Sequence, residues 1–203
     1  MQCKVCGMGY VPEIPDDSRE HRKYHDAVVN GLRVCPLKND VTIWSQGDVR
    51  ITVAKQLSPL AQRRRVEKVA RLANRETHYN FGLYCAGEPA NELDTHAFVL
   101  YKGKRAVGLL LADKRDRVWK AYWADWGIGK KPEEVTGSSP IWSIGFVWVI
   151  KHLRRQELAT TIVNEAVTYL GCSCETVGWY TPFTELGEHL VRSCCPDMFY
   201  IAK

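Results

Sequence analysis

The chain has 203 residues, of which 45% are hydrophobic and 25% charged, with seven tryptophans. This length and composition suffice to bury a core without disulfides and exclude disordered, collagen-like and coiled-coil chains. The 28 basic and 23 acidic residues give a net charge of +5, a mild preference for anionic partners. No apolar run approaches the roughly 20 residues of a membrane span, and no signal-peptide core follows Met1, so we expect a soluble intracellular protein.

The N-terminal segment contains two pairs of metal-ligand residues. Two residues separate Cys3 from Cys6, and three separate His21 from His25. The short cysteine spacing lets both thiolates reach one ion, and the histidines share a helical face because residues i and i+4 are neighbours. Four such ligands suit tetrahedral zinc without an open position, and so short a segment needs the metal to fold. We therefore predict a structural Cys2His2 zinc finger over residues 1–34.

The finger does not have the features of a DNA-reading module. It is single, and its loop carries acidic residues that repel phosphates: Glu13, Asp16 and Asp17. Packing or protein docking is the favoured role, and nucleic acid stays an open but less favoured partner. Four more cysteines near the C-terminus lack the two-residue gap and are interpreted as buried free thiols: Cys172, Cys174, Cys194 and Cys195.

A linker and an α/β domain are expected after the finger. Residues 35–47 show no sustained periodicity and predict the linker, and residues 48–203 form the domain. Alternation predicts a strand over residues 49–53, and two apolar runs, 96–101 and 106–112, predict a hairpin.

A helix is predicted over residues 59–76, with Ser58 as its N-cap. Its inner face carries three apolar residues, Val66, Val69 and Ala73. The basic run 63–65 on this helix is interpreted as a solvated face rather than an anion site. Three tryptophans further on have spacing that fits one helical face, with strand alternation as the alternative: Trp119, Trp123 and Trp126.

A strand over residues 144–150 leads through a basic turn into a helix over residues 158–170, closed by Gly171. The first N–H groups of such a helix have no intrahelical partner, and its dipole is positive there, so the turn forms an anion cradle. Its basic, polar and small residues suit a pyrophosphate. The glycines of a dinucleotide fingerprint and the P-loop motif are absent. The alternative interpretation is an arginine pair at 154–155 that makes only structural ion pairs.

The finger and this cradle together resemble the sister-chromatid-cohesion acetyltransferases, zinc-finger members of the GNAT superfamily. The resemblance rests on the finger motif, on residues 148–159 and on residues 180–187, and is weak between 35 and 88. It implies a GNAT acetyltransferase fold, an α/β architecture with a mixed sheet, behind the finger. It also implies acetyl-CoA as cosubstrate beside the structural zinc.

By this resemblance, the strand and the turn bind acetyl-CoA, with its pyrophosphate in the cradle. The residues assigned to the cofactor are Trp148, Val149, Arg154, Arg155, Gln156, Glu157, Leu158, Ala159 and Thr160. Acetyl transfer also requires a hydrogen-bond donor to the thioester carbonyl, for which we expect a backbone N–H near Val149.

The family's proton-handling positions are changed in this sequence. Its late carboxylate corresponds to Thr181, and its serine on the strand to Gly145. Its helical glutamate falls on Asn164, next to Glu165. The remaining catalytic candidates are Glu165 or a water held by Thr181 as base, and Tyr180 as acid for the leaving thiolate. An exposed glutamate and a core tyrosine are the structural alternatives.

The sequence therefore predicts an acetyl-CoA-dependent N-acetyltransferase that acts by direct transfer on a primary amine, with a protein lysine as favoured acceptor. A small-molecule amine or an aminoacyl-tRNA are alternative acceptors, and a non-catalytic acetyl-CoA-binding interaction module is the alternative to an enzyme. We expect no membrane partner and leave the oligomeric state open. The expected location is the nucleus in a eukaryote, or the cytoplasm for a bacterial or phage protein.

Overall fold

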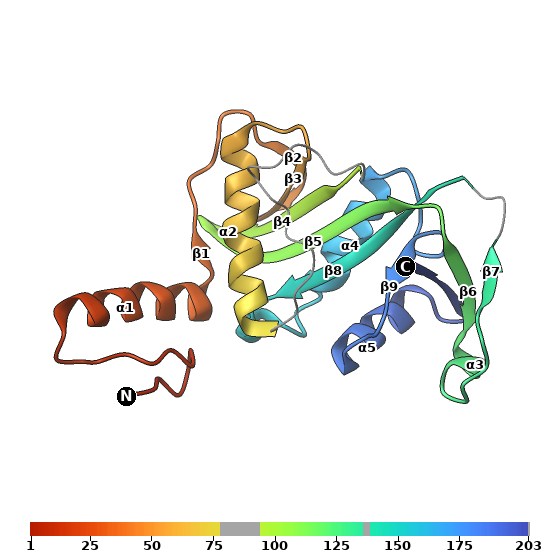
Figure 1. Cartoon of the computed structure of the whole chain (residues 1–203). Coiled ribbons are helices and arrows are strands. Elements are labelled where there is room, and N and C mark those ends of the chain that lie inside the picture. Colours follow the sequence, from red (N-terminus) through yellow and green to blue (C-terminus); the bar gives the residue numbers. More distant parts are fainter. Residues whose placement is uncertain (78–93, 136–138, 203) are drawn as a thin grey trace.

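The computed structural model describes residues 1–77, 94–135 and 139–202 (Figure 1). Its helices are α1 (Pro15–Asn30), α2 (Leu60–Thr77), α3 (Trp123–Trp126), α4 (Leu158–Tyr169) and α5 (Glu185–Cys194), with a 3-10 turn, η1 (Lys151–Leu153). Its strands are β1 (Leu32–Arg33), β2 (Val41–Gln46), β3 (Val49–Lys55), β4 (His96–Lys102), β5 (Arg105–Arg115), β6 (Val118–Tyr122), β7 (Glu133–Val135), β8 (Ile141–Val149), β9 (Gly178–Tyr180) and β10 (Met198–Ala202). None of the described helices combines the length and apolarity needed to cross a bilayer.

All of these strands join one mixed sheet. Its order is β2-β3-β4-β5-β8-β9-β10-β6-β7, and β1 pairs with β5 outside this path. The pairs β2–β3, β3–β4, β4–β5 and β5–β8 are antiparallel. Strand β9 is parallel to both of its neighbours, β8 and β10. The pairs β10–β6 and β6–β7 are antiparallel. The predicted class, α/β with a mixed sheet, is confirmed.

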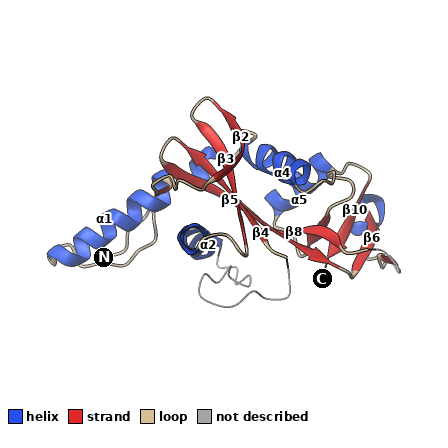
Figure 2. Cartoon of the chain, turned by 90° about the horizontal axis from the view of Figure 1, so that it is seen from above, coloured by secondary structure: helices blue, strands red, loops and turns tan. Residues whose placement is uncertain are grey.

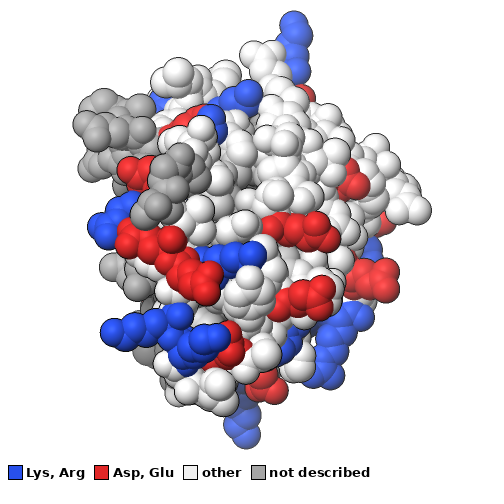
Figure 3. All heavy atoms as spheres, turned by 90° about the vertical axis from the view of Figure 1, so that its right-hand side faces the viewer, with Lys and Arg blue, Asp and Glu red and all other residues white. Residues whose placement is uncertain are grey.

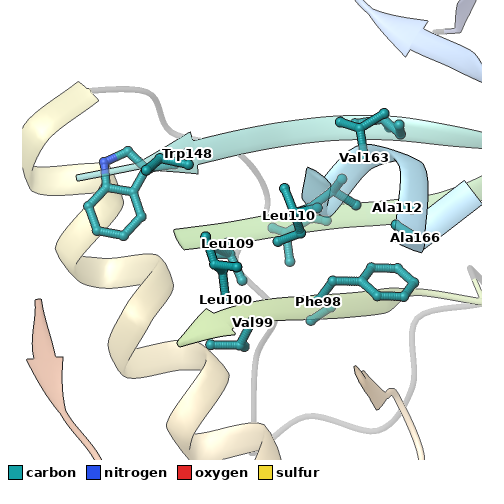
Figure 4. Close-up of a cluster of buried hydrophobic side chains, with 14 of the residues drawn as sticks. Phe98, Val99, Leu100, Leu109, Leu110, Ala112, Trp148, Val163 and Ala166 are labelled. Carbon is teal, nitrogen blue, oxygen red and sulfur yellow. The ribbon is translucent and has the colours of Figure 1, made fainter. Parts of the chain in front are cut away.

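Two helices enclose the central strands, α2 on one face and α4 on the other (Figure 2). Both helices bury apolar residues that recur at i, i+3 and i+4, the pattern from which the sequence analysis predicts them. On α2 the predicted inner residues are fully buried: Val66, Val69 and Ala73. On α4 the buried residues are Ile162, Val163, Ala166 and Val167. Figure 4 shows Val163 and Ala166 over the strand residues Phe98 and Leu110, with Trp148 directed toward α2.

The segment predicted as a linker contributes an edge strand. Residues 41–46 form β2, which pairs with β3 through a turn at Gly47, where φ is 59°. Most of its side chains are exposed, so the segment carries no apolar period that would reveal a strand. The first half of the segment is anchored by Asp40, which forms an ion pair with Arg65 of α2.

Two local predictions are corrected. Ser58 does not cap α2, because its Oγ accepts a hydrogen bond from the Lys55 N–H at 2.8 Å and closes the turn after β3. The tryptophans do not share a helical face, because Trp119 lies in β6 and the other two in the short α3. Trp123 and Trp126 instead pack with Phe199, at ring-centroid distances of 4.1 and 5.2 Å.

Candidate functional site

The four predicted metal ligands come together at the start of the chain. The ligand atoms of Cys3, Cys6, His21 and His25 all lie within 4.8 Å of one another. The cysteines belong to a knuckle that closes with the Gly7 N–H donating to the Cys3 carbonyl at 2.9 Å, with φ of 74° at the glycine. Both histidines lie on α1, as their spacing requires.

The donor chemistry of this cluster fits zinc. The His21 Nε2 atom is buried and has no hydrogen-bond partner in the structure, as expected of an atom reserved for a metal. Hydrogen bonds from the backbone N–H groups of Cys6 and Val5 lower the pKa of Cys3 to about 5, which favours the thiolate that binds zinc. Tyr10 stacks on the His21 ring at 3.8 Å and holds its orientation. Two thiolates and two imidazoles suit a closed tetrahedral site.

An ion pair at the C-terminal end of α1 joins the finger to the sheet. Asp26 of α1 accepts two hydrogen bonds of 3.0 Å from the guanidinium of Arg105 on β5. Gly31 allows this close approach, because a Cβ there would lie 2.6 Å from the Ala106 carbonyl oxygen. In Figure 1, the rest of α1 and the knuckle extend away from the sheet.

A second candidate site lies where β8 and β9 separate. Ser143 pairs with Gly178 and Ile144 with Trp179, and no further pair joins these strands among the described residues. Gly178 allows the contact at the joined end, because a Cβ there would lie 2.5 Å from Ser143 Oγ. Beyond it, residues 145–149 pair only with β5, so β8 has an open edge.

The open edge of β8 presents backbone donors. The Ile150 N–H bonds to the Val107 carbonyl of β5 at 2.9 Å. Because successive residues of a strand direct their backbone groups to opposite sides, the N–H groups of Val147 and Val149 face away from β5. The expected donor at Val149 therefore faces the open edge, and Val147 supplies a second that the sequence did not identify.

The turn from β8 into α4 has the form of an anion cradle. Arg155 and Glu157 have φ of 61° and 60°, the positive values among non-glycine residues that the structure describes. Such conformations cost on the order of 1–3 kcal/mol each and cluster where a loop holds a ligand. No side chain caps α4, and its first turn has no acidic residue. The N–H groups of residues 158–160 have no described partner.

The two arginines of the turn have different environments. Arg154 Nε donates to the Val149 carbonyl at 2.8 Å, and its guanidinium forms an ion pair with Glu76 of α2. The same carboxylate accepts a hydrogen bond from Trp148 Nε1 at 2.7 Å. Arg155 is exposed and has no described partner. The Arg154 side chain therefore fixes the strand relative to α2, whereas the Arg155 side chain is available to an anion.

A β-bulge lies at the joined end of the open edge. The register between β5 and β8 shifts between Leu111 and Ala112, which leaves Gly145 as the extra residue on β8. A Cβ at Gly145 would lie 3.4 Å from the ring of Tyr180, the last residue of β9. Because Gly145 has no side chain, the tyrosine ring crosses β8 toward β5.

The Tyr180 hydroxyl reaches an aspartate that the sequence analysis did not single out. It donates to Asp113, 3.0 Å from each carboxylate oxygen. Arg115 forms an ion pair with the same carboxylate at 2.9 Å and lies 5.1 Å from the Tyr180 ring centroid. Burial, and then the charge of Asp113, raise the pKa of Tyr180 well above its usual value. The sequence feature that could have indicated this site is the pair Asp113 and Arg115, two charged residues on one face at the end of an apolar strand.

The other predicted catalytic residues are not brought into this cluster. His96, the partner of Ala112, has its ring 6.3 Å from that of Tyr169 on α4. Because side chains alternate along β5, Asp113 faces away from α4, and therefore away from Glu165. Glu165 is half-buried and has no described ion pair or hydrogen bond. Thr181 follows Tyr180 and is half-buried.

The basic run on α2 is not a free cationic surface. Arg65 is buried in its ion pair with Asp40, which contradicts the interpretation of the run as a solvated face for this residue. Arg63 Nε donates to the Ser58 carbonyl at 3.0 Å, and Arg64 is exposed. On the end of the molecule formed by β6, β7 and α3, acidic and basic side chains are interspersed (Figure 3).

The C-terminal cysteines have the surroundings of core thiols. In the part of the chain that the structure describes, the Cys2His2 cluster is the one group with metal-binding geometry. Cys195 is buried and its thiol donates to the Cys174 carbonyl at 2.8 Å. Burial raises the pKa of Cys195 to about 11, in keeping with a core thiol.

Comparison with known proteins supports the N-terminal finger and relates the rest of the chain to acetyltransferases. Residues 1–27 match the family model described as the zinc-finger of acetyl-transferase ESCO. Over 80% of its length, the chain is 23% identical to N-acetyltransferase ESCO2 of Mus musculus and to that of Homo sapiens. It spans only 27% and 28% of the length of these curated relatives.

The fold also matches a solved acetyltransferase domain. The xEco2 acetyltransferase domain, bound to a K105-CoA conjugate, superimposes with a TM-score of 0.62 at 20% identity. The match covers 82% of this chain and 98% of that domain. The resemblance to the sister-chromatid-cohesion acetyltransferases is thereby confirmed, as are the acetyltransferase fold and the N-terminal Cys2His2 finger.

Proposed function

We propose that this chain transfers an acetyl group from acetyl-CoA directly to a primary amine, with a lysine side chain of a protein as the acceptor. The observation that carries the proposal is the open edge of β8, whose unpaired N–H groups face away from β5 and which ends at the proposed anion cradle. The lysine acceptor is supported by xEco2, whose domain has this fold and was solved with a K105-CoA conjugate.

The cofactor is proposed to run from the cradle to the bulge. The N–H groups of residues 158–160 and the Arg155 guanidinium bind the pyrophosphate, because neither has a partner among the described contacts and both favour an anion. The N–H of Val149 then bonds to the pantetheine arm. Val147, nearer the bulge, supplies the donor that stabilises negative charge on the thioester oxygen during attack.

In this mechanism, Arg154 acts by holding the turn in place. Its contacts with Glu76 and Val149 tie α2, β8 and the turn together, so that the donors of the open edge stay aligned. The zinc finger is proposed to have a structural or protein-docking role, and it is attached to β5 through Asp26 and Arg105, close to where β5 pairs with the end of β8.

The test is calorimetric titration of the zinc-loaded protein with acetyl-CoA, followed by a free-thiol assay with lysine peptides. We expect micromolar binding and thiol release. Arg155→Ala should weaken binding by about tenfold or more, which corresponds to a lost charge-assisted hydrogen bond. Arg117→Ala, an exposed arginine on the β5–β6 turn, is the matched control and should bind as the wild type does.

The outcomes separate the alternatives. Absence of acetyl-CoA binding would contradict the proposal as a whole. Binding without thiol release, with lysine peptides, small amines and aminoacyl-tRNA each supplied, would favour a non-catalytic module. Thiol release with small amines alone, or with aminoacyl-tRNA alone, would confirm acetyl transfer but show that the acceptor is not a lysine.

A further inference from the structure

Next to the joined end of β8 and β9, the Tyr180 side chain passes over β8 and its hydroxyl donates to a carboxylate on β5. The Asp113 carboxylate accepts a hydrogen bond from the Tyr180 hydroxyl and forms an ion pair with Arg115. The side chain of Asp113 is 16% exposed, so the carboxylate is largely buried but still reaches solvent. The Tyr180 ring lies beside Gly145, where β8 and β9 begin to separate and where the proposed thioester end of the cofactor would lie.

We propose that Tyr180 and Asp113 form the path by which the acceptor amine loses its proton. The incoming ammonium gives one proton to Tyr180 Oη while the tyrosine passes its hydroxyl proton to the Asp113 carboxylate. This inference rests on the proposed acetyl transfer. In this inference Tyr180 carries a proton away from the acceptor amine. The sequence analysis gives it a different role, as the acid that protonates the leaving thiolate.

The relay accounts for every proton of the transfer. Loss of one proton to Asp113 leaves a neutral amine with a free electron pair. The C–N bond then forms at the thioester carbon, the C–S bond breaks, and the sulfur leaves with its electron pair. The second proton moves from the nitrogen to that sulfur, so that amide and thiol are formed. The proton on Asp113 is released to water.

The surroundings of Tyr180 favour a relay over ionisation of the phenol. Among the described residues, the charged groups that act on it are Asp113 and Arg115, both from β5. Because burial and the neighbouring carboxylate raise the pKa of Tyr180, the phenol stays protonated at neutral pH. Its oxygen can accept a proton only while its own proton moves to Asp113. Arg115 holds the carboxylate in place for that step.

Glu165 is not positioned for the same role. It lies on α4, and α4 covers the face of the sheet opposite to Asp113. Of the candidate proton acceptors, Asp113 is therefore the one that the described contacts connect to the opening between the strands.

The decisive experiment compares pH profiles of Asp113→Asn and Tyr180→Phe, measured as kcat/KM with a lysine peptide from pH 6.5 to 9.5. At pH 7 each variant should be slower by about 10²-fold or more, the usual contribution of a general base. The deficit should shrink by about tenfold per pH unit, because without the relay the enzyme depends on amine that has lost its proton to solvent. The double variant should be no slower than the slower single variant.

Controls separate this relay from a structural role and from the proposed function itself. Asp116→Asn, an exposed aspartate just after the same strand, should keep the wild-type profile. The amide oxygen that Asp113→Asn introduces still accepts a hydrogen bond from Tyr180, so this variant should fold and bind acetyl-CoA within about twofold of the wild-type Kd. A deficit that is equal at all pH values, or wild-type rates, would overturn the relay. A wild-type protein that binds no acetyl-CoA would instead overturn the proposed function.

Discussion

The zinc finger and the sheet are held together by different forces. Helix α1 has no buried residue, whereas α2 and α4 each bury an apolar face against the strands. Residues 1–30 therefore depend on the four ligands of one metal ion, while the sheet depends on burial of its core. The contrast implies that the finger can be unfolded without unfolding the sheet, and that different substitutions will affect each.

The largest expected effect is loss of the metal. Cys6→Ser combined with His25→Ala should remove one bound zinc per chain, because only two ligands remain. Zinc binding contributes about 10–16 kcal/mol in isolated finger peptides, so residues 1–30 should lose their fold. Native mass spectrometry measures the metal, and hydrogen exchange measures protection in α1 and in the sheet.

Cys35→Ser is the control, since Cys35 is an exposed free thiol outside the cluster. It should retain the zinc. If the double variant keeps its zinc, the assigned ligands are wrong. If its sheet loses protection together with α1, the two regions are not independent.

A smaller effect is expected inside the sheet domain, at the ion pair of Asp40 and Arg65. Their side chains are only 11% and 8% exposed. Asp40→Asn leaves the Arg65 guanidinium buried without its counter-charge, which should cost about 3–5 kcal/mol in the free energy of unfolding. Glu67→Gln removes the exposed pair with Arg71 on the same helix and should cost about 0.5 kcal/mol or less. Denaturant titration compares the two.

The same pair predicts a dependence on pH. Burial alone raises the pKa of Asp40, but hydrogen bonds from Arg65 and the Leu37 N–H outweigh it and lower the pKa below 3.8. Its stabilisation is therefore complete above pH 3.8 and is lost as the pH falls below this value. Asp40→Asn should lack this component of the acid transition. An identical acid transition in both proteins would show that the pair is not the cause.

What could be predicted from the sequence follows from how locally each feature is determined. The metal ligands were found because two short spacings define them, and α4 was found because its apolar period spans the whole helix. The edge strand β2 was missed because its pairing with β3, not its own pattern, makes it a strand.

The contacts of the second site were harder to predict. Tyr180 and Asp113 are 67 residues apart, and Arg154 and Glu76 are 78 apart. Whether such side chains meet depends on strand register, and in this sheet the register shifts at Gly145. The strand, turn and helix that form the proposed anion cradle were predictable from the sequence. The sequence did not show which way the two arginines face. It was compatible both with anion binding and with structural ion pairs, and the structure places Arg154 against α2 and Arg155 in solvent.

The smallest expected effect concerns the contact between the two regions. Asp26→Asn removes the carboxylate that receives both hydrogen bonds from Arg105, a partly exposed pair whose loss should cost about 1 kcal/mol. Hydrogen bonds from Arg105 and then Asn30 lower the pKa of Asp26, so this contribution also disappears as the pH falls below the usual aspartate range. Asp16→Asn, at the exposed start of α1, is the control. Hydrogen exchange should show faster opening at the C-terminal end of α1 only in Asp26→Asn, with the zinc retained. Unchanged exchange there would mean that the short connection through Gly31, rather than the ion pair, couples a metal-dependent finger to a core-dependent sheet.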